Sequence, residues 1–301
     1  MKTLLEQTLD LWRDQLVDWP LAAKFYGSLS SVKTREFVLG DIHIVAQYNP
    51  ARAASTTAQT DQKSIAQRPC FLCDCNRPPE QQSVDAGEFW ILLNPFPIFK
   101  QHFTLPHKQH TPQQILPYYA DFLFFAKELS DFVVFYNGPR CGASAPDHLH
   151  FQAGTKGVLP LVDDYMRLRD RQTECVDSYK DAVLLRLKGM YRKVLVIESE
   201  TAEASLYLFE RLYASLPGSK SEEPMMNVVG MYENGKWIVF VMPRIAFRPS
   251  QYHASGQERF LISPAALEMA GILITPVEEH FDRLTCDTIV SIYKQISPDE
   301  P

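Results

Sequence analysis

Three polar residues at alternate positions, His148, His150 and Gln152, are the side chains of this chain best suited to chemistry. If the segment is a strand, they share one face, and Leu149 and Phe151 share the other. An imidazole can act as a nucleophile or bind a metal, and an amide can donate hydrogen bonds to phosphoryl oxygens. Solvent exposure of the polar face would not require this order of residues. The pattern therefore predicts a site that acts on a phosphate group.

A loop of small residues precedes this strand and adds to the same prediction. Gly142, Ala143 and Ser144 follow Asn137 and Gly138, where an earlier strand is expected to end. Backbone amides in such a loop, together with a serine hydroxyl, can stabilise charge that develops on a phosphoryl group. We therefore predict Ser144 as a catalytic residue and the other four as substrate-binding residues.

The string His-Leu-His-Phe-Gln resembles the histidine-triad superfamily, specifically its nucleotidyltransferase branch. That branch includes galactose-1-phosphate uridylyltransferase, diadenosine tetraphosphate phosphorylase and GDP-hexose phosphorylase. Hydrolases of the superfamily usually have a third histidine where this chain has Gln152, and the uridylyltransferases usually have proline where it has Leu149. The string is therefore more similar to the GDP-hexose phosphorylases. The resemblance implies that His150 forms a nucleotidyl-histidine intermediate whose phosphoryl oxygens bind Gln152.

A Cys-x-x-Cys pair, Cys70 and Cys73, has the spacing with which two thiolates bind one tetrahedral zinc ion. Its loop-like flanks favour zinc over a redox dithiol. His107 and His110 are candidate further ligands downstream. The resemblance to the uridylyltransferases implies the set Cys70, Cys73, His110 and His148, with His107 as the alternative to His110. Four protein ligands leave no open position for water, so the zinc would be structural.

Three further residues are predicted to bind substrate. Asn94 lies in Asn-Pro-Phe-Pro, which resembles the element that lines the nucleotide cleft of the superfamily, although a simple strand end is an equal alternative. Arg52 and Arg248 lie in loop-like segments, where a planar guanidinium could bind a phosphate. A solvated surface arginine is the ordinary alternative for both.

Composition restricts the partners. The chain has 301 residues and a formal net charge of −6, which argues against nonspecific binding to nucleic acid or anionic membranes. The first 19 residues mix charged and apolar side chains as in an amphipathic helix, not a signal peptide, and we find no apolar run that could span a bilayer. We expect a cytoplasmic protein with reduced thiols that are free to bind zinc.

The pattern of hydrophobic residues and turn signals predicts an α+β fold of the histidine-triad type, an antiparallel sheet with helices. In the first half we expect helices over 3–18 and 111–130, an irregular loop over 53–67, and strands within 37–48, 89–94, 102–105, 132–136 and 147–153. The second half loosely repeats this plan, with a strand over 193–197, a helix over 202–214, a hairpin over 227–242, and helices that start near residues 263 and 275, the latter with a capping box completed by Glu278.

The repeated plan predicts two repeats in one chain. The second repeat would be degenerate, because it has no His-x-His-x-Gln string. Residues 1–170 would form the catalytic half with the zinc site, and residues 171–301 would complete the substrate cleft. The predicted function is nucleotidyl transfer or phosphorolysis of a nucleoside diphosphate sugar or dinucleoside polyphosphate, with phosphate or a sugar phosphate as acceptor. A nucleotide hydrolase and a non-catalytic, zinc-stabilised nucleotide-binding protein are the alternatives. The uridylyltransferases and the small triad proteins are commonly dimers, so the resemblance makes a homodimer one possibility and leaves the oligomeric state open.

Overall fold

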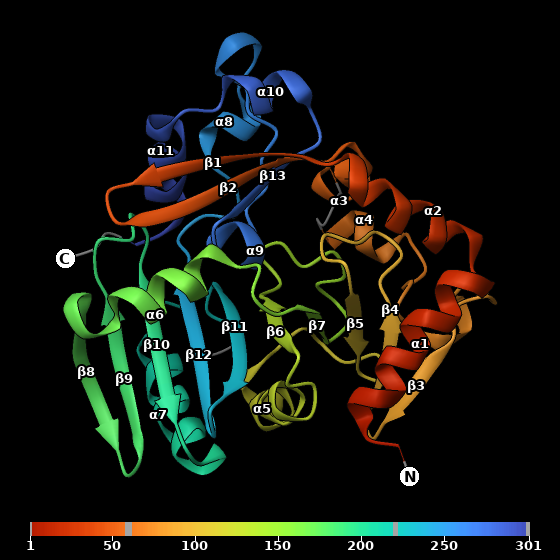
Figure 1. Cartoon of the computed structure of the whole chain (residues 1–301), viewed down its shortest axis with the longest axis horizontal. Helices are drawn as coiled ribbons and strands as arrows, with labels where there is room; N and C mark the ends of the chain where they lie inside the picture. Colours follow the sequence, from red (N-terminus) through yellow and green to blue (C-terminus); the bar gives the residue numbers. More distant parts are fainter. Residues whose placement is uncertain (1, 58–61, 219–221, 299–301) are drawn as a thin grey trace.

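A ten-stranded antiparallel sheet forms the centre of the protein (Figure 1). The computed structural model describes residues 2–57, 62–218 and 222–298. The order of strands across the sheet is β3-β4-β5-β7-β6-β11-β12-β10-β9-β8. A second sheet, in the order β1-β2-β13, lies against one face of the large sheet. This architecture confirms the predicted α+β class.

The strands are β1 Lys33–Leu39, β2 Ile42–Tyr48, β3 Ser83–Ala86, β4 Phe89–Leu93, β5 His102–Pro106, β6 Phe132–Asn137, β7 His150–Thr155, β8 Thr173–Tyr179, β9 Ala182–Leu187, β10 Val194–Ser199, β11 Met226–Glu233, β12 Lys236–Pro243 and β13 Ile272–Thr275. The α-helices are α1 Leu4–Asp18, α2 Pro20–Ser28, α3 Ala53–Thr56, α4 Gln62–Ala66, α5 Tyr119–Glu128, α6 Pro160–Gln172, α7 Ala202–Ser215, α8 Ser250–His253, α9 Ala266–Met269, α10 Glu278–Arg283 and α11 Cys286–Ile296.

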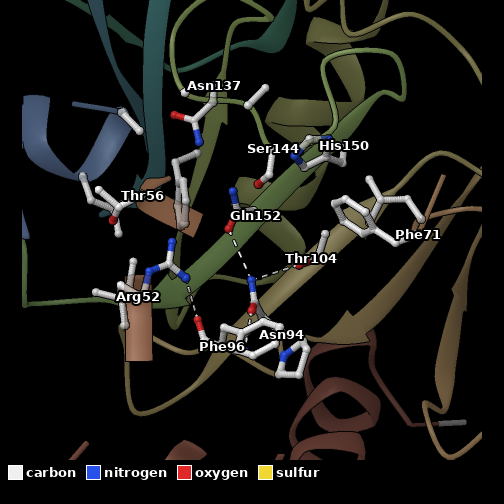
Figure 2. A pocket seen from close by; sticks show the side chains of 18 of the residues that line it. Arg52, Thr56, Phe71, Asn94, Phe96, Thr104, Asn137, Ser144, His150 and Gln152 are labelled. Atoms are coloured by element: carbon white, nitrogen blue, oxygen red, sulfur yellow. Dashed lines mark hydrogen bonds between the residues drawn. The ribbon is translucent and has the colours of Figure 1, made fainter. Parts of the chain in front are cut away.

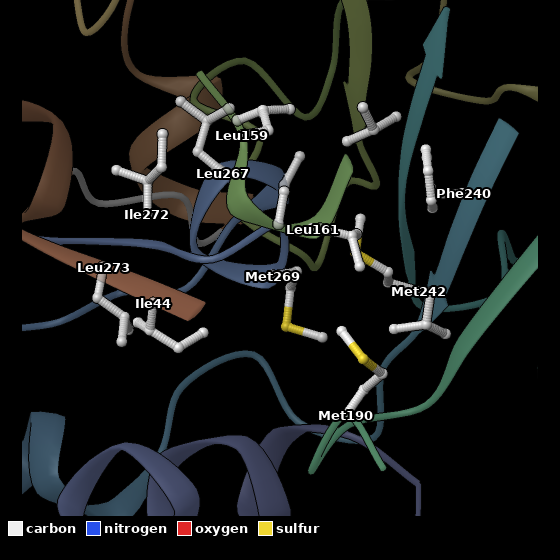
Figure 3. Close-up of a cluster of buried hydrophobic side chains, with 14 of the residues drawn as sticks. Ile44, Leu159, Leu161, Met190, Phe240, Met242, Leu267, Met269, Ile272 and Leu273 are labelled. Carbon is white, nitrogen blue, oxygen red and sulfur yellow. The ribbon is translucent and has the colours of Figure 1, made fainter. Parts of the chain in front are cut away.

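Each face of the large sheet is covered by its own hydrophobic core. Helices α1, α5 and α7 pack on one face, where Phe151 of β7 lies among Phe89 and Phe122. Helix α6, the small sheet and the C-terminal helices cover the other face, and Figure 3 shows side chains of this second core. Alternation along the strands supplies both cores, as expected for a sheet covered on both sides.

The same order of elements occurs twice along the chain. In each half, three strands precede a helix and two strands follow it: β3 to β5, α5, β6 and β7 in the first half, and β8 to β10, α7, β11 and β12 in the second. The halves join where β6 pairs with β11. They also interlock, because β13 from the end of the chain pairs with β2 from its start. A common origin of the halves and the domain boundary at residue 170 stay predictions.

Several predicted elements differ from the structure. The helix predicted over 111–130 begins only at Tyr119, after a 3-10 turn that contains Pro117. The reason is that residues 111–113 lie alongside the start of β7 and hydrogen-bond to it. The carbonyl of Thr111 accepts from the amide of Leu149, and the buried Gln113 side chain bonds to the backbone of His150. Two short helices, α3 and α4, lie within the predicted loop 53–67, and residues 58–61 are outside the described part.

The predicted capping box at Glu278 does not form. Strand β13 continues to Thr275, whose hydroxyl accepts from the amide of Val277, and α10 therefore begins at Glu278 itself. In the described ranges, we find no helix whose length and apolar content would carry it across a bilayer.

Candidate functional site

Strand β7 carries the predicted catalytic side chains and lies in the interior of the sheet. It pairs with β5 on one side and with β6 on the other. Leu149, Phe151 and Ala153 are buried in the core under α5, so His150 and Gln152 face the opposite side. The predicted division of the two faces is therefore confirmed for His150 and Gln152, whereas His148 lies before β7 and not within it. Pairing with β5 fixes the height and direction of both side chains, and Gln152 is paired with β6 as well.

His150 is held in a defined orientation. Its Nδ1 lies 2.8 Å from the carbonyl oxygen of His148, which can only accept, so Nδ1 carries the proton and Nε2 has a free lone pair. The imidazole is buried, and burial lowers its pKa to about 4. Gln113 forms two hydrogen bonds with the backbone of the same residue: its Oε1 accepts from the His150 amide, and its Nε2 donates to the His150 carbonyl. The ring is therefore neutral and rigid.

Gln152 is oriented by a histidine that the sequence reasoning missed. His102, at the start of β5, has its Nε2 3.0 Å from the Gln152 Oε1, and its Nδ1 accepts from the amide of Ile98. This arrangement makes His102 the donor and directs the amide oxygen of Gln152 toward it. The pKa of the buried His102 falls to about 3 because of its burial. The NH₂ group of Gln152 is left for another acceptor.

Asn94 supports the same amide. Its Nδ2 donates to Thr104 and lies 3.5 Å from the Gln152 Oε1, while its own oxygen accepts from the amide of Phe96. These contacts use the side chain of Asn94 within the protein. Its place beside the cavity is as predicted, and its contacts indicate that it orients Gln152.

Residues from both halves of the chain contact the small-residue loop 142–144 and its neighbour Cys141. Arg68 donates to the carbonyl of Ser144 at 2.6 Å. Gly142 has φ +98°, and a Cβ there would lie 2.5 Å from the Cβ of Ala265, so glycine is required for the loop to approach the second half this closely. Asn227 of β11 donates to the carbonyl of Cys141. The backbone of this loop is therefore preorganised beside β7.

Arg244, the arginine that precedes Arg248 after the same strand, uses its guanidinium within the protein. It follows β12, is almost fully buried, and donates to the side chain of Asn227 and to the carbonyl of Pro264. Asn227 in turn donates to Asn137, whose side-chain oxygen also accepts from the amide of Ala266. A chain of hydrogen bonds thus runs from the second half to the end of β6.

Four residues converge as a candidate metal centre: the ligand atoms of Cys70, Cys73, His110 and His148 all lie within 4.8 Å of one another. Tetrahedral zinc with ordinary bond lengths separates sulfur and nitrogen ligands by about 3.6 Å. Three such separations are 3.2 Å (Cys70 Sγ to His148 Nδ1), 3.3 Å (Cys73 Sγ to His110 Nδ1) and 3.5 Å (Cys73 Sγ to His148 Nδ1).

The surroundings of this cluster also fit a metal. The Nε2 of His148 lies 2.8 Å from the carbonyl of His107, and the Nε2 of His110 lies 3.4 Å from Asp147. Acceptors on the outer nitrogens direct the Nδ1 lone pairs of both rings inward, as in many protein metal sites. His107 instead places its own Nδ1 near the backbone of Gln109. Of the two histidines left open by the sequence, His110 is the one in the cluster.

A cavity of about 540 Å³ lies over this face of β7. Figure 2 shows Gln152 in its middle, with His150 and Phe71 on one side and Arg52 and Thr56 on the other. The predicted site residues that line it are Arg52, Asn94, Asn137, Gly142, Ala143, Ser144, His150, Gln152 and Arg248.

Gly138 is the exception among the predicted binding residues. Its backbone packs against β11, where its amide donates to Met226, and it does not line the cavity. Glu268 of α9 does line the cavity and was not predicted. No motif in the sequence identifies it, because its place in the site depends on how α9 packs against β6 and β11.

Comparison with known proteins agrees with this geometry. Residues 11–155 match a family described as a domain of unknown function, DUF4922. No curated protein matches the sequence. The crystal structure of yeast Ap4A phosphorylase Apa2 in complex with Ap4A has a TM-score of 0.64 and 18% identity, over 99% of this chain and 98% of that chain. A second structure, of yeast Ap4A phosphorylase Apa2, gives a TM-score of 0.57 at 15% identity, over 99% and 95%.

The chain therefore shares the fold of yeast Ap4A phosphorylase Apa2. The resemblance that His-Leu-His-Phe-Gln suggested is confirmed at the level of the fold. The likeness extends over nearly the whole chain, so it includes the second half, which has no triad-like string of its own.

Proposed function

We propose that this protein is a nucleotidyltransferase of the phosphorylase type that forms a nucleotidyl-histidine intermediate on His150. Its donor is a nucleoside diphosphate sugar or a dinucleoside polyphosphate. The observation that carries the proposal is the hydrogen bond between the Nδ1 of His150 and the carbonyl of His148, which leaves a neutral Nε2 on the cavity wall. The fold shared with an Ap4A phosphorylase supports the same class of reaction.

In the first step, the Nε2 lone pair of His150 attacks the α-phosphorus of the donor. A phosphorus–nitrogen bond forms, and the bond from that phosphorus to the bridging oxygen breaks. The leaving group departs as a sugar phosphate or a nucleoside polyphosphate with the electron pair of that bond. The NH₂ group of Gln152 and the amides of residues 142–144, which line the cavity, would donate to the phosphoryl oxygens as charge moves onto them.

In the second step, an oxygen of inorganic phosphate attacks the same phosphorus. The phosphorus–nitrogen bond breaks, its electron pair returns to Nε2, and the nucleoside diphosphate leaves. His150 is regenerated as the neutral imidazole, so one site serves the donor and the acceptor in turn. A sugar phosphate in place of inorganic phosphate would give exchange between sugars by the same step.

A structural zinc ion fits the four clustered residues. Cys70, Cys73, His110 and His148 would hold it through two sulfur and two Nδ1 atoms, and four protein ligands leave no position for a reacting water. The ion would neutralise the two thiolates and tie residues 70–73 to the start of β7. The contribution of these residues to the reaction is to fix His148, whose carbonyl orients His150.

Water as the acceptor would make the protein a hydrolase. The presence of Gln152, held by His102, argues against it, because the amide offers no proton acceptor near the incoming water. A non-catalytic nucleotide-binding protein is the other alternative, and it would need no oriented Nε2.

Phosphorolysis tests the proposal directly. We would incubate the wild-type protein with GDP-, UDP- and ADP-sugars and with diadenosine tetraphosphate, each with and without phosphate, and separate the nucleotide products. We expect release of a nucleoside diphosphate that depends on phosphate and is lost in His150→Ala at unchanged thermal stability. Release of a nucleoside monophosphate, with or without phosphate, would identify a hydrolase, and no release with any donor would favour a binding protein.

A further inference from the structure

Glu268 is buried beside the cavity, and no side chain of the described residues forms a hydrogen bond or an ion pair with it. It lies on α9, is 7% exposed, and lines the cavity together with Arg52, Arg248 and Ser263. Its Oε2 accepts from the amide of Ala265 at 2.9 Å. Within residues 2–57, 62–218 and 222–298, no side chain donates a hydrogen bond to this carboxylate.

Burial without a full set of donors is costly for a carboxylate, which can accept about four hydrogen bonds. The positive charges of Arg52 and Arg244 offset part of that cost, but neither forms an ion pair with Glu268 in the described part of the chain. Lone pairs of a carboxylate in the cavity wall are therefore available to a ligand. Such a ligand must supply hydrogen-bond donors.

Arg52, which is close enough to Glu268 for their charges to interact, suggests where the phosphates of the ligand would end. Arg52 uses its Nη1 for the carbonyl of Phe96 and faces the cavity across Gln152 from His150 (Figure 2). Arg248 donates from Nε to Ser263. A short diphosphate between His150 and Arg52 has a matching cation. A longer polyphosphate chain would bring phosphate oxygens toward Glu268, and like charges in a buried site repel strongly.

We propose that Glu268 accepts hydrogen bonds from the hydroxyl groups of a sugar in the leaving half of the donor, and disfavours a polyphosphate chain at that position. The inference rests on the proposed function and selects between its two donor classes, in favour of nucleoside diphosphate sugars. A carboxylate that bridges neighbouring hydroxyls gains two charge-assisted hydrogen bonds, which are stronger than bonds between neutral groups.

The test compares donors that share one base and differ in the leaving half. We would measure single-turnover formation of nucleotidyl-enzyme from a nucleoside diphosphate hexose, a dinucleoside tetraphosphate and a nucleoside 5′-phosphorimidazolide, which has no sugar or phosphate chain in its leaving group. The variants are Glu268→Gln, which keeps the shape, and Glu268→Ala. Glu210→Gln, exposed on α7 on the opposite face of the sheet, is the matched control.

We expect wild type to prefer the hexose donor over the tetraphosphate donor. In Glu268→Gln, the rate with the hexose donor relative to the phosphorimidazolide should fall about tenfold or more, the size expected for losing a hydrogen bond to a charged group. The rate with the tetraphosphate donor relative to the phosphorimidazolide should rise. Glu210→Gln should match wild type in both ratios.

Different failures are distinguishable. If wild type prefers the tetraphosphate donor, or if both ratios are unchanged in Glu268→Gln and Glu268→Ala, the role of Glu268 is overturned and the proposed function stands. If wild type forms no nucleotidyl-enzyme even from the phosphorimidazolide, the proposed function fails, and this inference fails with it.

Discussion

At the scale of single residues, the two polar side chains of β7 each have one polar atom bound by the protein and one left toward the cavity. The Nδ1–H of His150 donates to the carbonyl of His148, and the Nε2–H of His102 donates to the amide oxygen of Gln152. A nucleophilic nitrogen and a pair of N–H donors are thereby presented together. Orientation of this kind is inexpensive in free energy at the moment of reaction because the hydrogen bonds are already formed.

Replacement of His102 tests the orientation of Gln152. In His102→Phe the ring bulk stays, but Gln152 loses the donor to its Oε1 and its amide can rotate. We expect formation of nucleotidyl-enzyme to slow by roughly 10- to 100-fold, as for the loss of one buried hydrogen bond, with His150 intact. Single-turnover rates measure this. Unchanged rates in a folded variant would show that His102 does not position the amide.

Spacing made part of this site predictable. His148, His150 and Gln152 are adjacent in the sequence, and Cys70 and Cys73 have a ligand spacing, so their types and intervals carry the prediction. His102 and Glu268 could not be found in this way, and neither could the buried contacts of Arg244. Their contacts depend on the pairing of strands, as between His102 and Gln152, 50 positions apart, and between Arg244 and Asn227, 17 positions apart.

At the scale of elements, the Cys-x-x-Cys segment and the start of β7 are joined through His148. Cys73→Ser should lose the bound metal, and a structural zinc site contributes about 10 kcal/mol of apparent binding free energy, so the folded state should be strongly destabilised. We expect a lower melting temperature and slower nucleotidyl transfer, because His148 no longer fixes His150.

Cys75→Ser is the matched control, since Cys75 is exposed on the same segment and outside the four-residue cluster. Metal content and melting temperature should match those of wild type. If Cys73→Ser retained a full equivalent of metal, the assignment of the ligands would be wrong.

Glu223, in a loop of the second half, hydrogen-bonds to the segment 111–118 that precedes α5. Glu223 is buried, accepts from the amide of Ile115 and from the hydroxyl of Tyr136, and burial raises its pKa to about 7. The folded state therefore holds this proton more tightly than the unfolded chain, so stability falls as pH rises from about 4.5 to about 7.

Comparison of wild type with Glu223→Gln isolates that effect. The difference between their free energies of unfolding should shift by about 3 kcal/mol against wild type between pH 4.5 and pH 7.5, because glutamine does not titrate. Denaturant unfolding of the metal-loaded proteins at several pH values measures it. A constant difference across this range would mean that Glu223 has an ordinary pKa.

Element prediction succeeded where hydrophobic alternation and turn signals coincide, as in the hairpin of β11 and β12 around Asn234, which has φ +51°, and Gly235. It was wrong over 111–118. Thr111 and Pro112 are good helix-starting residues. The Gln113 side chain, however, hydrogen-bonds to the backbone of Asn137 in β6 and of His150 in β7, and these tertiary hydrogen bonds outweigh the local preference for a helix.

At the scale of the whole molecule, the sheet is continuous across the predicted boundary at residue 170. Strand β6 pairs with β11, and Arg244 and Asn227 of the second half hold Asn137 and the carbonyl of Cys141. The second half contributes Glu268 and Arg248 to the cavity wall. Neither half therefore has a complete core or a complete site.

A fragment of residues 1–170 should consequently fail to fold on its own. Strand β6 would become an unpaired edge, and much of the core on both faces would be exposed. We expect one cooperative unfolding transition for the full chain and none for the fragment, followed by circular dichroism. Two separate transitions in the full chain would establish independent domains.

The covalent intermediate is the central claim, and the mass of the intact protein after exposure to a donor without acceptor tests it most directly. We predict that wild type gains the mass of one nucleoside monophosphate, that the gain disappears on addition of phosphate, and that His150→Ala gains nothing. A gain that persists in His150→Ala would place the nucleotide on another residue. Phosphate-dependent turnover with no covalent gain in wild type would contradict the two-step account.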